Sequence, residues 1–567
     1  MIRAVQKASK GLMQFGSVFF RIALFMIAVV IAISPIKEVC VAQIGRLSNR
    51  RIEQVIANDG FYNQSFSKPK YNVEARFAPD FITVKCVLDF EVQKEFKGFL
   101  PLMLYEGFQF DSVKYNEEDL PVKCWFKHGQ VKCWRVYLPR LKAGDDVQLF
   151  LIYSGKAPVA QDYLLYSSAQ KWYPQPLGLT EGAITFRCII DQEWEPYFSG
   201  FSTPVVELKE DVKLHEYLVS HPFSLLLINK HLHNLWQEEE LRFWADRTLA
   251  GEERLLLQQA VTELNTYYTT RIGELPERSR YYLITDKQDT QTRANLYSAV
   301  IGFKGKDQIE TEGAGAELKN DFIFELAAGL AQAWWGGAVR PEGSGGAALL
   351  TGLTAYNAYL AAKEVYSPEA ASGIIDQWYE RYLLSKQKFL WYEKPLNEIT
   401  PFLDWQQQLA ECKTPLVLHA LSYLTGEEEF LQILKETYQE YTGGTVTIGD
   451  FQTVAEKISG LDLQWFFAYF FENAFHLDLE IVSCASQQMA EGYRTAVLLS
   501  GAGDRFKGQV DVEVQTETET IRYRIDLAEH GKETVIVETE EPVQVVWLDP
   551  DAWWPDLNRE NNLWRNK

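Results

Sequence analysis

The sequence predicts a multidomain α+β protein with the order β domain, helical domain, β domain, preceded by one apolar N-terminal segment. At 567 residues the chain is too long for a single hydrophobic core. Its pattern changes from short alternating runs to long helical periodicity and back again. We predict an N-terminal membrane or signal segment at 1–45, a β domain at 60–235, a helical domain at 236–477 and a C-terminal β domain at 478–567.

The N-terminal segment has basic residues followed by an apolar stretch over 12–36, with an uncharged core at 22–34. This core is short for a membrane-spanning helix and typical of the apolar part of a signal peptide. If the apolar segment is extended back to residue 19, it is long enough to span a membrane, and Arg21 then lies inside it. We therefore expect an uncleaved membrane anchor or a cleaved signal peptide, with a buried helix as the third alternative. The first two place the body outside the cytoplasm, membrane-anchored or secreted.

The net charge of −21 argues against a nucleic-acid partner, because binding to phosphates needs a basic surface. The same charge favours a soluble, self-repelling surface on the folded domains.

Residues 71–206 alternate apolar and polar side chains in short runs separated by Gly, Pro, Asp and Asn. The runs 81–88 and 147–153 are typical of strands with one buried face. We predict an antiparallel β-sandwich here, followed by two further strands at 207–220 and 223–228.

Seven cysteines occur, none in a CxxC pair, which argues against a structural zinc knuckle. A two-residue turn at His128–Gly129 would place Cys124 opposite Cys133 at a non-hydrogen-bonded position, where the strands approach most closely. The pair is a candidate disulfide. The alternative is two free thiols on one face of the sheet.

Helical periodicity begins at 252–271, where apolar residues recur at the spacing of one helix face. A strand is expected at 281–285, and long helices over 318–473. Alternation returns at 510–514 and 543–548, which predicts the small C-terminal β domain.

The most informative segment is 324–360, which reads FELAAGLAQAWWGGAVRPEGSGGAALLTGLTAYNAYL. A helix with small residues leads into Trp334-Trp335-Gly336. A Gly-rich turn follows, and a second helix is expected from about Ala347. This pattern resembles the active-site segment of the aminopeptidase N family, a group of gluzincin zinc metallopeptidases that includes membrane alanyl aminopeptidase. That family has HELAHxWWGN followed by a helix with LxEGxAxY.

In the family, two His at i and i+4 on one helix face bind zinc, the Glu between them is the general base, and a Glu on the next helix is the third ligand. Aligned on the two tryptophans, the His positions fall at Ala328 and Gln332, the base at Gly329 and the third ligand at Thr351. The family's catalytic tyrosine falls at Glu411. The resemblance therefore implies a degenerate member without zinc ligands, general base or catalytic tyrosine, and without a cofactor.

A second register one helical turn earlier aligns 324–328 with HELAH and keeps Glu325, but it breaks the spacing to the tryptophans. Neither register supplies a histidine. The close pair His231 and His233 could chelate a relocated metal if it lies on a strand, although a solvated turn before a charged run explains the pair better. We predict that His419 is a core histidine with its hydrogen bonds satisfied.

Further similarity to the family covers 412–421, 426–431 and 451–467, and more weakly the whole of 71–551. The family's amine-gripping GxMEN motif has its nearest counterpart at 294–301, which lacks the Glu.

The resemblance implies an N-terminal β-sandwich, a central thermolysin-like and mostly helical domain, and a C-terminal Ig-like β domain, with a peptide-accommodating groove between the first two. The missing ligands imply a catalytically inactive peptidase-like protein. Its role would be to bind or scaffold a peptide or protein at the outer membrane face, alone or beside an integral-membrane partner. The alternative is a metallopeptidase-like hydrolase with a relocated or altered active site.

Overall fold

The computed structural model describes residues 64–566. Short internal stretches are not described: 79–80, 129, 157–162, 167–170, 178–182, 192, 199–204, 210–211, 220–224, 230–232, 239–240, 247–250, 276–279, 286–292, 296–297, 304–308, 311–316, 372, 390–393, 400–403, 475, 502–505 and 528–530. The predicted membrane or signal segment lies outside the described residues. Among the helices that are described, none is long and apolar enough to cross a membrane.

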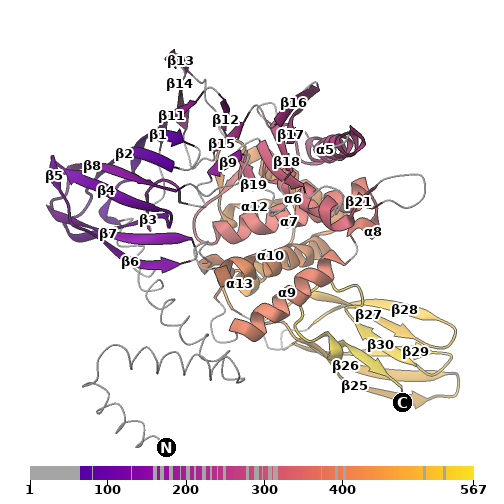
Figure 1. The fold of residues 1–567 in the computed structure, drawn as a ribbon. Coiled ribbons are helices and arrows are strands. Elements are labelled where there is room, and N and C mark those ends of the chain that lie inside the picture. The colour runs from indigo at the N-terminus through magenta and orange to yellow at the C-terminus, as the bar shows by residue number, and fades with distance from the viewer. Residues whose placement is uncertain are drawn as a thin grey trace, which may run out of the picture. The chain divides into compact units, whose positions relative to one another are not determined.

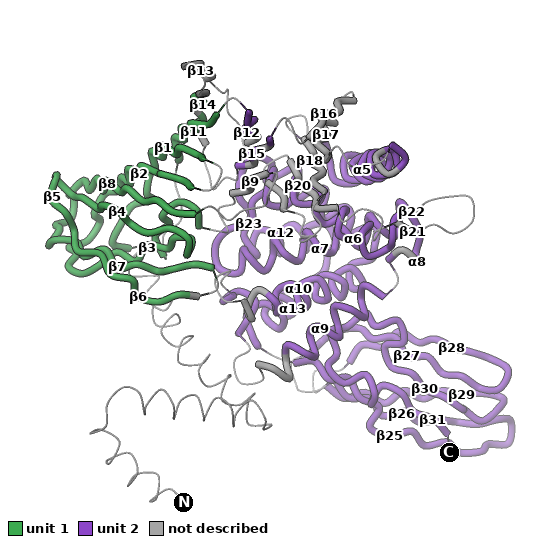
Figure 2. Tube along the Cα trace, in the orientation of Figure 1, with its two compact units in different colours: residues 1–192, 201–222 green, residues 193–200, 223–567 purple. Residues whose placement is uncertain are grey.

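The chain is a multidomain α+β protein in which N-terminal β-sheets are followed by a helical region and C-terminal antiparallel sheets (Figure 1). This confirms the predicted order of structural classes. The chain divides into two compact units, which we describe separately (Figure 2). Unit 1 comprises residues 1–192 and 201–222, and unit 2 comprises residues 193–200 and 223–567.

Unit 1 contains an eight-stranded sheet with the order β13-β14-β11-β1-β2-β8-β4-β5 and a four-stranded sheet with the order β10-β3-β7-β6. Its strands are β1 (Lys70–Ala78), β2 (Phe81–Glu91), β3 (Phe96–Tyr105), β4 (Phe108–Tyr115), β5 (Glu118–Asp119), β6 (Val122–His128), β7 (Val131–Leu141), β8 (Asp146–Gly155), β9 (Tyr163–Tyr166), β10 (Gln175–Pro176), β11 (Ile184–Asp191), β13 (Val205–Lys209) and β14 (Val212–Val219).

The sheets of unit 1 follow from alternation in the sequence. β2 and β8 bury every second side chain, as a strand with one face on the core must, and both were predicted. The rings of Phe110 and Trp134 meet between the two sheets with centroids 5.6 Å apart.

The prediction of a purely antiparallel sandwich was wrong, because β1 and β11 of the larger sheet pair in parallel. β11 returns after a long excursion of chain, which parallel pairing requires.

The predicted pairing of Cys124 with Cys133 was also wrong. The β6–β7 turn lies one residue later than expected, so that His128 pairs with Val131. A bulge at Trp125 then shifts the ladder, and Cys124 faces Trp134 while Phe126 faces Cys133. Both thiols are free, with Cys124 exposed and Cys133 buried. A bulge adds one unpaired residue to one strand and changes which side chains lie opposite.

Unit 2 begins with short strands and continues as a helical bundle. The strands are β12 (Trp194–Phe198), β15 (Leu225–Asn229), β16 (His233–Glu238), β17 (Leu241–Asp246), β18 (Arg280–Thr285), β19 (Arg293–Asn295), β20 (Ser298–Phe303), β21 (Ile309–Glu310), β22 (Glu317–Leu318), β23 (Arg340–Pro341) and β24 (Thr445–Val446). The helices are α5 (Gly251–Arg271), α6 (Asn320–Ala331), α7 (Gly346–Val365), α8 (Pro368–Ala371), α9 (Ile374–Phe389), α10 (Asp404–Thr425), α11 (Glu427–Tyr441), α12 (Ile448–Ser459) and α13 (Gln464–Phe470), with a 3₁₀ turn η4 (Leu396–Glu398).

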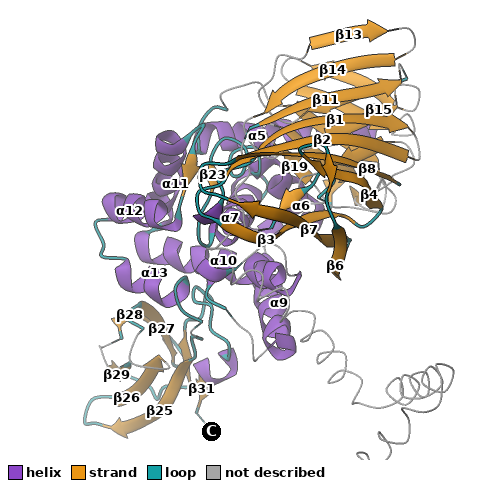
Figure 3. Ribbon diagram, turned by 90° about the vertical axis from the view of Figure 1, so that its left-hand side faces the viewer, coloured by secondary structure: helices purple, strands orange, loops and turns teal. Residues whose placement is uncertain are grey.

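The C-terminal part of unit 2 forms two antiparallel sheets with the orders β25-β26-β29 and β28-β27-β30-β31 (Figure 3). Its elements are β25 (Leu479–Gln488), β26 (Tyr493–Gly501), β27 (Gln509–Gln515), β28 (Thr520–Asp526), β29 (Lys532–Thr539), β30 (Val545–Leu548), η5 (Arg559–Asn562) and β31 (Leu563–Arg565). One hydrophobic core runs without interruption from the helices into these sheets. The helical region and the C-terminal β region are therefore packed as one unit.

Helices α7 and α10 pack together at Gly352. A Cβ atom at this position would lie 2.5 Å from Thr414 Cγ2 and 3.1 Å from Leu418 Cδ1. We expect Gly352→Ala to lower the free energy of unfolding by about 1–3 kcal/mol, because the added methyl overpacks this contact. Urea denaturation followed by circular dichroism measures the change.

Gly449 in α12 provides the matched control for Gly352. A methyl group added here would have Thr447 Oγ1 as its nearest neighbour, at 3.8 Å. Gly449→Ala should therefore be neutral or stabilise by up to about 1 kcal/mol, the usual gain from glycine to alanine in a helix. Equal effects at both positions would contradict a close approach of α7 and α10.

Candidate functional site

The candidate site consists of α6, the turn that follows it, and α7, which packs beside α6 (Figure 1). After Ala331 the helix tightens into turns, in which the N–H groups of Ala333 and Trp334 donate to the carbonyls three residues earlier, those of Leu330 and Ala331, at 2.9 and 3.1 Å. Gly336 then adopts a φ of 106°, in the left-handed region that glycine reaches without strain. The turn reverses the chain and leads into α7.

Both tryptophans of this turn are fully buried. Trp334 Nε1 donates to the Gly273 carbonyl at 2.8 Å, and its ring centroid is 5.0 Å from that of Tyr268. Trp335 meets Tyr438 edge to face with centroids 6.5 Å apart. These contacts give the Trp-Trp pair a packing role that fixes the end of α6.

The three predicted metal-ligand positions lie on the two neighbouring helices. Ala328 is half-buried in α6, Gln332 is half-buried at its C-cap, and Thr351 is half-buried in the first turns of α7. Thr351 Oγ1 donates to the Ala347 carbonyl of its own helix at 2.9 Å.

This donor set does not fit zinc. Alanine has no ligand atom, and Gln and Thr offer only neutral oxygens, whereas Zn²⁺ in proteins takes imidazole, thiolate or carboxylate. The hydroxyl of Thr351 already donates a hydrogen bond to a backbone carbonyl of its own helix.

The other two predicted positions also lack catalytic groups. Gly329 is buried in α6 and has no side chain to accept a proton. Glu411 of α10 forms an ion pair with Arg381 of α9, with Oε2 and Nη2 2.9 Å apart. Glu411 thus links two helices at the position where the family resemblance expects a tyrosine.

His419 is a core histidine with a hydrogen-bond partner, as predicted. Its Nδ1 lies 3.2 Å from the hydroxyl of Tyr356, and its ring stacks on Trp553 with centroids 4.4 Å apart. Burial lowers its pKa to about 3, and the positive charges of Lys363 and Arg559 act in the same direction. The imidazole is therefore neutral near pH 7 and belongs to the packing of the core.

The alternative sites are less fully placed. His231 lies outside the described residues and His233 begins β16, so the suggestion that this pair chelates a metal stays a prediction. Glu325, retained by the second register, is half-buried on α6. Within the described part of the chain, no three His, Cys, Asp or Glu side chains are grouped so that they could hold a metal ion.

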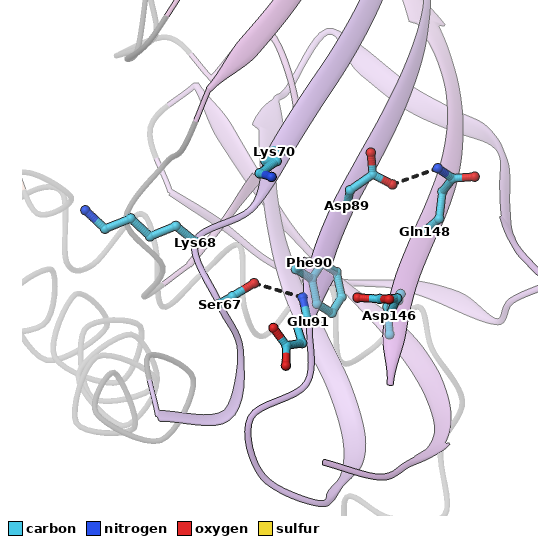
Figure 4. Close-up of a pocket in the computed structure, with 9 residues that line it drawn as sticks. Ser67, Lys68, Lys70, Asp89, Phe90, Glu91, Asp146 and Gln148 are labelled. Carbon is cyan, nitrogen blue, oxygen red and sulfur yellow. Dashed lines mark hydrogen bonds between the residues drawn. The ribbon is translucent and has the colours of Figure 1, made fainter. Parts of the chain in front are cut away.

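A shallow hollow of about 480 Å³ lies on unit 1, at the ends of β1, β2 and β8 (Figure 4). Lys70, Asp89 and Gln148 lie opposite one another in the ladder of β1, β2 and β8, and Gln148 Nε2 donates to Asp89 Oδ1 at 2.8 Å. Glu91 and Asp146 lie directly opposite each other in the ladder. Sequence analysis did not find this hollow, because its residues come from three strands and are far apart in the chain.

No family model matches this chain, and a comparison with curated proteins finds no match either. The similarity to the aminopeptidase N family therefore depends on the residues quoted above and stays a prediction.

Proposed function

We propose that this chain is a catalytically inactive, peptidase-like protein that acts by binding or scaffolding a peptide or another protein. The main support is the state of the helix pair α6–α7. The helices and the tryptophan turn between them are present, while Ala328 and Thr351 offer no zinc ligand and Glu411 is committed to an ion pair with Arg381.

The rest of the proposal follows the family resemblance. The N-terminal sheets would be a β-sandwich, the helical region thermolysin-like, and the C-terminal sheets Ig-like. The predicted N-terminal segment would hold the body at the outer membrane face, where the partner is a peptide, a soluble protein or an integral-membrane protein. A polar, acidic surface of net charge −21 favours soluble or basic ligands over nucleic acid.

The first test is metal content and activity of the purified full chain. Because the donor set does not fit zinc, we expect far less than about one equivalent after loading with zinc and dialysis, by elemental analysis. Loss of the general base and the metal each removes orders of magnitude in rate. Aminoacyl and dipeptide reporters should therefore show no cleavage that a chelator suppresses.

A fluorescently labelled pool of unstructured peptides tests the binding half of the proposal. Saturable anisotropy with peptides recovered intact supports a binding protein. Stoichiometric zinc with chelator-sensitive cleavage would instead favour the hydrolase with a relocated site. In that case the double variant His231→Ala, His233→Ala shows whether this pair holds the metal.

A further inference from the structure

The four-stranded sheet of unit 1 is basic, although the chain as a whole is acidic. Its strands β3, β6, β7 and β10, as the structure describes them, contain no Asp or Glu, whereas the net charge of the whole chain is −21. The basic residues of these strands are Lys97, Lys123, Lys127, Lys132, Arg135 and Arg140. Cations gathered on one sheet repel one another and attract anionic partners.

Half of these cations already have an acceptor at one end of β3. Lys127 forms an ion pair with Glu106, and Lys132 Nζ donates to the Glu106 carbonyl at 2.6 Å. Arg140 forms an ion pair with Glu95. The other half form no ion pair within the described part of the chain, and these are Lys97, Lys123 and Arg135.

Aromatic rings hold the side chain of Arg135. Its neighbour Trp134 on β7 meets Phe110 of the larger sheet, so Arg135 points to the opposite face of the four-stranded sheet. The central guanidinium carbon lies 4.1 Å from the ring centroid of Trp125 and 4.7 Å from that of Phe99. These two rings meet edge to face with centroids 5.2 Å apart. The guanidinium is therefore fixed before any ligand arrives, which lowers the entropic cost of binding.

The fixed guanidinium has unused hydrogen-bonding capacity. Its Nε is buried and has no hydrogen-bond partner among the described residues. The exposed Lys123 of β6 lies directly opposite Arg135 in the ladder, and like charges in this position destabilise a sheet. A carboxylate bound between the two cations would remove this repulsion.

We propose that this surface, formed by Phe99, Lys123, Trp125, Arg135 and Tyr137 and here called the arginine–aromatic face, binds an acidic peptide segment of a partner protein. The planar guanidinium suits a carboxylate, to which it can donate two parallel hydrogen bonds. Lys123 supplies a second cation beside it. The ring of Tyr137 extends the aromatic surface, with its centroid 5.9 Å from that of Phe99, so that apolar parts of the segment can pack on the rings.

The composition of the face favours a peptide over a membrane. Binding to anionic lipid typically takes a cluster of about four to eight Lys and Arg, more than the cations left unpaired here. The rings of Phe99, Trp125 and Tyr137 also contact one another or Arg135 and are half-buried. The face belongs to unit 1 alone. The proposal therefore does not depend on α6 and α7, nor on the absence of peptidase activity.

Fluorescence anisotropy with the purified full chain tests the proposal. The probe is a rhodamine-labelled peptide in which Glu alternates with Ser, and the matched probe has Gln in place of every Glu. We expect the Glu peptide to bind at least about tenfold more tightly, because only carboxylates form charge-assisted hydrogen bonds. Its affinity should fall as salt is added. Equal affinity for the two peptides would overturn the proposal.

Variants of the full chain locate the binding. Arg135→Gln should weaken binding of the Glu peptide by about 10–100-fold, the range for losing hydrogen bonds to a charged group. Lys123→Gln should weaken it by about two- to fivefold, as expected for an exposed charge. Arg140→Gln is the matched control, because Arg140 is on the same strand and is already paired with Glu95. Its affinity should stay within about twofold of the natural chain.

Arg135→Lys is the second variant if Arg135→Gln does not fold, as circular dichroism would show. It keeps the charge but loses the planar fork and the ring stacking, so binding should weaken by about tenfold. Unchanged binding in the folded variants of Arg135 would refute the proposal. Binding of phosphatidylserine vesicles that depends on Arg135, without binding of the Glu peptide, would also refute it and identify a membrane contact. Neither result affects the zinc and cleavage tests of the inactive-peptidase proposal.

Discussion

Trp554→Ala should lower the free energy of unfolding of unit 2 by about 3–5 kcal/mol, the range for removing a buried tryptophan. Trp554 is fully buried and meets Phe506 edge to face, with centroids 4.6 Å apart. Its Nε1 donates to the Gln509 carbonyl at 3.0 Å. The substitution opens a cavity where the helices meet the C-terminal sheets and leaves that carbonyl without its partner.

Urea denaturation followed by far-ultraviolet circular dichroism measures this loss. Trp547→Ala is the matched control, because Trp547 on β30 is 40% exposed and its removal should cost much less. If both variants lose the same amount, the continuous core between the helices and the β region is not the main source of stability. A loss near zero for Trp554→Ala would contradict its packing role.

The parts of the fold that follow from local periodicity were predictable. β2 and β8 alternate so regularly that a one-residue slip would expose the core, and the expected strands 81–88 and 147–153 lie within them. The helix expected at 252–271 is α5, within one residue. In each case neighbouring residues alone decide the element, so no distant contact was needed.

Features that depend on distant residues were not predictable. Parallel pairing of β1 with β11 brings together segments about a hundred residues apart, and no local pattern specifies it. The bulge at Trp125 gives no signal in a run that alternates in the ordinary way. Each of these changes a pairing without changing the elements themselves.

At the candidate site, too, the features that depend on residue type were predictable and those that depend on distant contacts were not. The sequence alone reveals that Ala328, Gly329, Gln332 and Thr351 lack the groups that zinc hydrolysis needs, because this is a matter of residue type. It does not reveal that Glu411 pairs with Arg381 across two helices.

Restoring the ligands should give the chain a zinc site. In the triple variant Ala328→His, Gln332→His, Thr351→Glu, the two imidazoles stand four residues apart, one in the last turn of α6 and one at its C-cap, and the carboxylate comes from the packed neighbour α7. Three such ligands with one water make a complete zinc coordination. We expect about one equivalent of zinc retained through dialysis and lost to a chelator, against almost none in the natural chain.

Gly329→Glu is added only in a second step, because Gly329 is buried and a carboxylate there can destabilise α6. The resulting quadruple variant should bind zinc with little peptidase activity, because Glu411 still occupies the tyrosine position. A further Glu411→Tyr change should raise chelator-sensitive cleavage above the quadruple variant. Rates from reporter peptides at saturating zinc compare the two.

The second register provides the matched control for the zinc site. Phe324→His, Ala328→His, Ala347→Glu applies the same nineteen-residue spacing one turn earlier and keeps the native Glu325 as base. Phe324 meets Trp378 edge to face at 6.0 Å, so this variant also gives up a ring contact. Zinc in the first triple variant and none in the control assigns the register anchored on Trp334-Trp335-Gly336. Zinc bound by the control variant alone would place the site one helical turn earlier. If both variants fold and neither binds zinc, α6 and α7 do not form a zinc-peptidase helix pair.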